Sequence, residues 1–201
     1  MTFLFVFFSV PVLANVCAVH RQIPGVTFTS PEWSMRVESA DLGGDAHGIV
    51  DARLSEQIML SVRRVTVRGG DCFILTGVDA SIGFTEFIVK IDQSYTSGTC
   101  EFDVIMNHEQ EHIRANLSVM HGMAEEWRRA LELSSNSVIP VFVPTGRTND
   151  HVSDVFMRTI QSHPSIVLIR QKTESEKEFR NRQVDLRTGY DEALLRACRR
   201  N

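Results

Sequence analysis

One long stretch with the apolar period of an α-helix, from about Glu101 to Leu133, constrains the fold more than any other feature of the sequence. Thr99 can cap its first turn, and Glu101 and Asp103 suit the positive end of a helix dipole. At about 100° per residue, the apolar side chains form one stripe roughly 80° wide. The stretch therefore predicts a single long core helix, whose stripe consists of Phe102, Met106, Ile113, Leu117, Met120, Ala124, Trp127 and Leu131.

Before this helix, three runs have the composition and alternation of β-strands. Turn-forming residues separate them, at Gly69-Gly70-Asp71 and at 79–83. The runs predict an antiparallel meander, with a short helix at 51–59 as a weaker expectation. They are Ile58–Val67, Cys72–Val78 and Phe84–Ile91.

The part of the chain after the long helix predicts mostly helices. Residues 138–143 suit a strand or an extended crossing, and Asp150 can cap a helix that ends near Ser162. Pro164 can begin another helix that runs to about Val184, and a last short helix would follow Thr188. A small antiparallel or mixed sheet followed by helices indicates the α+β class.

The composition suits one globular domain. The chain has 201 residues, of which 43% are hydrophobic and 23% charged, so it can bury a sizeable core. Its net charge is −4 and its 21 basic residues are spread along the chain, which argues against nucleic acid as a partner. No run of 18 or more apolar residues exists, so the sequence predicts no membrane span.

The N-terminal residues resemble an export signal. Residues 3–13 are mostly apolar, and Val12 and Ala14 occupy the small-residue positions of a cleavage site. We therefore expect residues 1–14 to be a signal peptide and 15–201 to be the mature domain, periplasmic or secreted from a bacterium. The alternative is a buried N-terminal strand.

Four cysteines remain after such a cleavage, and an even number in an exported chain predicts two disulfides. Three pairings exist. We expect Cys72–Cys100, which would tie the sheet to the long helix, and Cys17–Cys198, which would fasten the termini. The alternative is four reduced cysteines in the core of a cytosolic protein.

The long helix contains the sequence His108-Glu109-Gln110-Glu111-His112, an HExxH motif. The spacing puts both imidazoles on one helix face, where they can bind one zinc ion. Glu109 falls inside the apolar stripe, where a carboxylate is costly unless it has a partner, and Glu111 falls on the opposite side. The motif predicts zinc ligands at His108 and His112 and a general base at Glu109. The alternative is a solvated helix with two surface histidines.

Zinc needs a third protein ligand. The metzincin continuation of the motif is absent, because Ala115 and Ser118 stand where glycine and histidine would be needed. Later carboxylates and histidines of the same helix lie roughly 13 to 21 Å beyond His112, too far to share an ion. The ligand should follow the helix, and the candidates are His151, Asp154, His163, Asp185 and Tyr190.

Two segments, 95–114 and 182–190, resemble the bacterial exported proteins known as predicted secreted zinc-dependent proteases, which are minimal zincins. The first contains the HExxH motif, and the second has a Gln, an Asp, a Thr and Tyr190 in similar order. The resemblance implies a zincin-like fold whose C-terminal residues return over the zinc. It implies that Asp185 is a ligand or orients a histidine, and that Tyr190 binds zinc weakly or donates to the oxyanion.

These features together predict an exported zinc metallopeptidase with one zinc ion per chain. Its substrate would be a peptide or protein, and the strand at 84–91 would be the sheet edge that pairs with it. One alternative keeps the metal without catalysis, in a zinc-binding envelope protein that acts as a partner module. Another is a helical adaptor without a metal.

Overall fold

A computed structural model describes residues 16–43, 46–188, 195, 196 and 198 of the chain. The expected signal peptide lies outside the described residues. So do Tyr190 and most of the expected last short helix.

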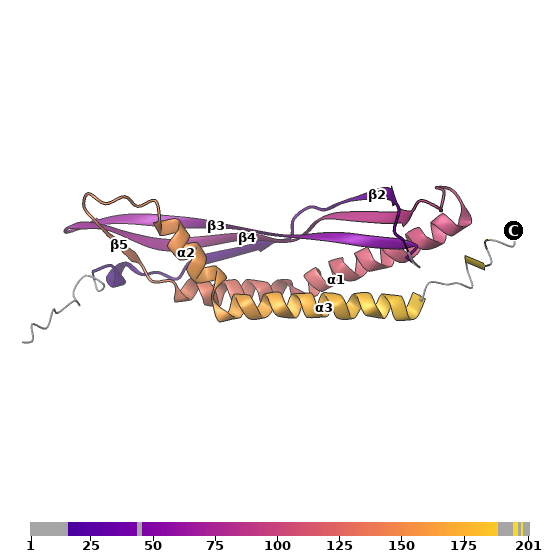
Figure 1. The fold of residues 1–201 in the computed structure, drawn as a ribbon. Coiled ribbons are helices and arrows are strands. Elements are labelled where there is room, and N and C mark those ends of the chain that lie inside the picture. The colour runs from indigo at the N-terminus through magenta and orange to yellow at the C-terminus, as the bar shows by residue number, and fades with distance from the viewer. Residues whose placement is uncertain (1–15, 44–45, 189–194, 197, 199–201) are drawn as a thin grey trace, which may run out of the picture. The chain divides into compact units, whose positions relative to one another are not determined.

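The protein has the α+β architecture that the sequence predicts (Figure 1). The described residues form one five-stranded sheet, three α-helices and a short 3-10 helix. The strands are β1 (Gly25–Thr29), β2 (Ser34–Ala40), β3 (Gly48–Val67), β4 (Gly70–Asp92) and β5 (Val141–Pro144). The helices are η2 (Ala18–His20), α1 (Cys100–Ser137), α2 (Val152–Gln161) and α3 (Pro164–Thr188).

The long strands β3 and β4 form a hairpin whose turn contains Gly69 with a φ of 88°. The predicted break at 79–83 is wrong, because β4 continues through it with Ala80 and Ile82 buried. The expected helix at 51–59 is also wrong. These residues belong to β3, where Asp51 and Arg53 form ion pairs with side chains of β4.

Strand β4 is central in the sheet. Its residues 86–92 pair in parallel with β2, and the strand also pairs with β3. The prediction that 84–91 is the sheet edge is therefore wrong. Within the described part of the chain, β3 has β4 as its partner, so the opposite side of β3 is an edge of the sheet.

The chain divides into two compact units. Unit 1 contains the described residues up to Thr27 together with Met59–Asp79 and Ala130–Ile166. Unit 2 contains Phe28–Ile58, Ala80–Arg129 and the described residues from Val167 onward. The strands β3 and β4 and the helices α1 and α3 each have residues in both units.

Unit 1 has an apolar cluster around a disulfide. Cys17, Cys72 and Ile74 are buried in it, and Val65 and Phe142 pack against them. Strand β5 pairs antiparallel with the first residues of β4, with Cys72 opposite Phe142. The cluster therefore joins the N-terminal segment to the beginning of β4.

In unit 2, α1 and α3 run side by side in opposite directions (Figure 1). The buried Trp127 of α1 donates from Nε1 to Thr173 of α3 at 3.1 Å, and ion pairs join Lys172 to Glu126 and Arg170 to Glu56. The α1 stripe faces the interior as predicted, with Ile113 and Trp127 buried. This packing fixes α3 against the face of α1 that carries the HExxH motif.

The two disulfides that the sequence predicts are present, but the predicted pairing is wrong. The bridges are Cys17–Cys72 in unit 1 and Cys100–Cys198 in unit 2. Cys72 is near the beginning of β4, whereas Cys100 begins α1 beyond the other end of that strand. The expected Cys72–Cys100 bridge assumed a short strand, and the length of β4 removes that assumption.

No helix among the described residues combines the length and the apolar character that a membrane crossing requires.

Candidate metal centre

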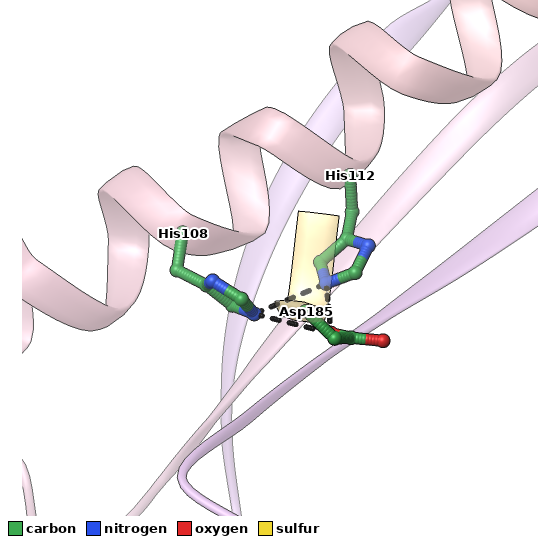
Figure 2. Close-up of side chains that lie close together, drawn as sticks. All are labelled: His108, His112 and Asp185. Carbon is green, nitrogen blue, oxygen red and sulfur yellow. Dashed lines mark hydrogen bonds and ion pairs between the residues drawn. The ribbon is translucent and has the colours of Figure 1, made fainter. Parts of the chain in front are cut away.

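Two imidazoles of α1 form the base of the candidate site (Figure 2). The helix begins where the sequence predicts, with the Phe102 amide donating to the hydroxyl of Thr99 at 3.3 Å. His108 and His112 lie one turn apart on the same face, with their Nε2 atoms 3.1 Å apart. His108 is only 7% exposed, so the pair lies at the inner side of the helix.

Asp185 of α3 completes a group of three metal-capable side chains with these histidines. Its Oδ1 lies 3.1 Å from Nε2 of His112 and 3.6 Å from Nε2 of His108. Figure 2 shows the imidazoles of His108 and His112 projecting from α1 toward Asp185. The carboxylate is exposed on its outer side, at 60% of its side-chain surface.

The separations of these three atoms suit a tetrahedral ion. Zinc bonds to nitrogen and oxygen are about 2.0–2.1 Å long, which places neighbouring tetrahedral ligand atoms about 3.3 Å apart. The observed separations of 3.1, 3.1 and 3.6 Å lie on both sides of that value. Two imidazoles and a carboxylate are also a donor set that catalytic zinc uses, with a fourth position for water.

Of the five third-ligand candidates, the structure brings Asp185 to the histidines. His151, Asp154 and His163 belong to unit 1, and His163 contacts the hydroxyl of Ser165 there at 2.7 Å. Tyr190 is outside the described residues. Helix α1 is unbroken from Cys100 to Ser137, so its later carboxylates are too far along the helix to be the third ligand.

Glu109 is buried beside the histidines and lines the same cavity of about 310 Å³. It is only 2% exposed, whereas Glu111 of the same motif forms an ion pair with Arg114 away from this cavity. Gly48 of β3 faces the Glu109 carboxylate so closely that a Cβ there would lie 2.6 Å from Oε1. A glycine at the beginning of β3 therefore leaves the space that the carboxylate occupies.

Burial lowers the pKa of His108 below its ordinary value, and the neighbouring His112 lowers it further. Asp185 opposes both effects by favouring the charged imidazole. The net result favours neutral His108, which is the form that binds a metal ion.

Sequence reasoning missed three residues of the site: Gly48, Asn116 and Asn181. Asn116 lies four residues after His112, on the same helix face as the motif, so the spacing could have identified it as a neighbour of the site. Asn181 precedes Asp185 by one helical turn, and its Oδ1 lies 2.7 Å from Nδ1 of His112. Gly48 gave no signal, because its role depends on which strand crosses Glu109.

Comparison with known proteins finds no match for this chain among protein-family models, curated proteins or solved structures.

Proposed function

We propose that the protein is an exported zinc-dependent peptidase whose ion is held by His108, His112 and Asp185. The observation that carries the proposal is the separation of their three ligand atoms, which suits the tetrahedral geometry of zinc. The two disulfides support an oxidising compartment. A helix with HExxH beside a mixed sheet supports a zincin-like fold.

A zinc ion held by these three residues would make a water molecule more acidic and would polarise the substrate carbonyl. Glu109 is the general base of this proposal, because it is buried in the wall of the same cavity as the two histidines. It accepts the proton of the attacking water and passes it to the leaving amine. Tyr190 is proposed to donate a hydrogen bond to the oxyanion, as the sequence resemblance implies.

The proposed substrate is a peptide in an extended conformation. Gly48, Ile49 and Val50 at the beginning of β3 line the cavity together with the histidines. Because β3 is at the edge of the described sheet, a peptide can pair with it as an added strand. This assigns to β3 the role that the sequence gave to residues 84–91.

The test measures zinc content and cleavage of a mixed peptide library for four proteins: the wild type, Glu109→Gln, Glu111→Gln and His108→Ala. We expect one zinc per chain in the first three and none in His108→Ala. Glu109→Gln should lose roughly 10²- to 10⁴-fold in turnover, the usual contribution of general acid–base catalysis. Glu111→Gln is the matched control and should keep its activity.

A fully zinc-loaded wild type without peptidase activity would contradict catalysis and favour a zinc-binding partner module. A wild type that binds no zinc would contradict the metal site itself.

A further inference from the structure

We propose that Asn181 is a positioning residue that sets the tautomer of His112, with Asn116 supporting it. The inference rests on the proposed metal site, and it adds the reason why His112 presents Nε2 to that site. It is carried by hydrogen bonds that join α1 to α3 inside unit 2.

The orientation of the Asn181 amide follows from its partners. One end of the amide lies 2.9 Å from Oδ1 of Asn116 and 2.8 Å from the carbonyl oxygen of Lys177. The Lys177 carbonyl can only accept, so this end must be the donating NH₂ group. The reversed amide would place an oxygen against that carbonyl. Oδ1 of Asn181 therefore faces His112.

This oxygen determines where His112 carries its proton. Oδ1 of Asn181 can only accept, and it lies 2.7 Å from Nδ1 of His112. Asp185 Oδ1 is a second acceptor, at 3.1 Å from Nε2, but the Asn181 contact is the shorter of the two, so we place the proton of a neutral His112 on Nδ1. Its Nε2 then has a lone pair, which faces His108 Nε2 and Asp185 Oδ1.

Asn116 keeps this arrangement in place. It is only 4% exposed and lies one turn after His112 on the same helix. Its Oδ1 accepts from Asn181 Nδ2, so the Asn181 side chain is held at its nitrogen end by two oxygens. The ligand nitrogen is thus oriented before any ion arrives, and partners of this kind typically contribute 10- to 100-fold to metal affinity.

The first part of the experiment does not use a metal. Long-range ¹H–¹⁵N NMR of the metal-free protein, at a pH where His112 is neutral, reports which ring nitrogen is protonated. We expect the Nδ1–H tautomer in the wild type and a mixture of both tautomers in Asn181→Ala. An Nε2–H tautomer or a mixture in the wild type would overturn the inference.

The second part measures zinc affinity by competition with a chelator. Asn181→Ala should bind zinc roughly 10- to 100-fold more weakly than the wild type. Asn181→Asp should restore part of the affinity, because its carboxylate also accepts from Nδ1–H and the Asn116 amide can turn to donate, while its second oxygen faces the Lys177 carbonyl. Gln171→Ala removes an exposed amide from the same helix and should bind zinc as the wild type does.

The outcomes separate this inference from the proposed function. Wild-type zinc affinity in Asn181→Ala, or the same loss in Asn181→Asp as in Asn181→Ala, would overturn the positioning role. If the wild type has the expected tautomer but binds no zinc, the metal proposal fails while the assignment of the tautomer stands.

Discussion

Helix α1 buries polar side chains in different ways in the two units of the chain. In unit 1 the buried Ser134 and Ser135 each donate to a backbone carbonyl three residues earlier in α1. In unit 2 the buried His108, Glu109 and Asn116 direct their polar atoms toward a cavity or toward another helix. One helix supplies all five residues, so burial of a polar group does not by itself mark a site.

The contrast lies in where the hydrogen bonds go. A buried serine that bonds to its own helix leaves no polar group for a ligand. In unit 2, His108 instead faces Asp185 of α3 and Asn116 bonds to Asn181 of α3, and the Nε2 atoms of the two histidines lie close to the same carboxylate oxygen. Convergence from different elements is therefore what separates the candidate site from ordinary helix packing.

The largest expected effect comes from removing the disulfides one at a time. Each double variant, Cys17→Ser/Cys72→Ser and Cys100→Ser/Cys198→Ser, should lower the free energy of unfolding by roughly 2–5 kcal/mol. Only the second should also weaken zinc binding, by about tenfold or more, because its bridge fastens the chain beyond α3 to the first turn of α1. Chemical denaturation and chelator competition measure the two quantities.

Equal losses of zinc affinity in the two disulfide variants would show that both bridges act through overall stability. The two units would then not differ in how their disulfides affect zinc binding.

Two glycines provide a smaller and sharper comparison. A Cβ at Gly48 would overlap the end of a flexible side chain, Glu109, so Gly48→Ala should displace the carboxylate and lower turnover by about 10²-fold with zinc retained. A Cβ at Gly70 in unit 1 would overlap the Val143 backbone carbonyl and lie 2.8 Å from the Phe142 ring. Gly70→Ala should therefore cost about 1–3 kcal/mol of stability without a specific effect on activity.

Peptidase assays at full zinc loading and thermal unfolding distinguish these two glycine variants. A Gly48→Ala protein that unfolds at a lower temperature but retains the turnover of the wild type would contradict the role assigned to this glycine.

The smallest expected effect concerns two partly exposed carboxylates. Hydrogen bonds from Arg64 and Thr66 lower the pKa of Asp71 in unit 1, and bonds from the Ser94 hydroxyl, the Ser94 amide and the Leu42 amide lower that of Asp92 in unit 2. Each carboxylate stabilises the fold above its ordinary pKa of 3.8 and loses that contribution as pH falls through its lower folded value.

Salt should separate these two carboxylates, because Asp71 pairs with a charged group whereas neutral donors are the largest cause of the lowered pKa of Asp92, with a smaller contribution from the charge of His47. We expect the destabilisation by Asp71→Asn to shrink in 1 M NaCl and that by Asp92→Asn to persist. Both should vanish at the acid end of a series of urea titrations across pH. Identical responses to salt would remove the distinction.

The helical half of the fold was predictable from local signals. The stripe of α1, its cap at Thr99 and the beginning of α3 at Pro164 all depend on neighbouring residues, and all appear near the expected positions. His108, Glu109 and His112 were predictable for the same reason, since their geometry is set by one helix.

The sheet and the disulfide pairing were not predictable in the same way. Ala80-Ser81-Ile82-Gly83 is typical of a turn, but strands on either side of β4 satisfy its backbone and keep it extended. The cysteine pairing depends on the length of β4, because Cys72 is near its beginning and Cys100 comes after its end. Asp185 was one candidate among five, because only the packing of α3 on α1 selects it.

The Asn181 amide is neutral, so it orients His112 without adding a charge to the pocket. With Glu109 ionised, its carboxylate and that of Asp185 contribute two negative charges, which a divalent cation cancels. Because an unbalanced charge is costly beside the buried Glu109, the proposed site should prefer a dication over a monovalent or trivalent ion. Proton transfer from water to Glu109 would then move charge within the pocket while its sum stays at zero.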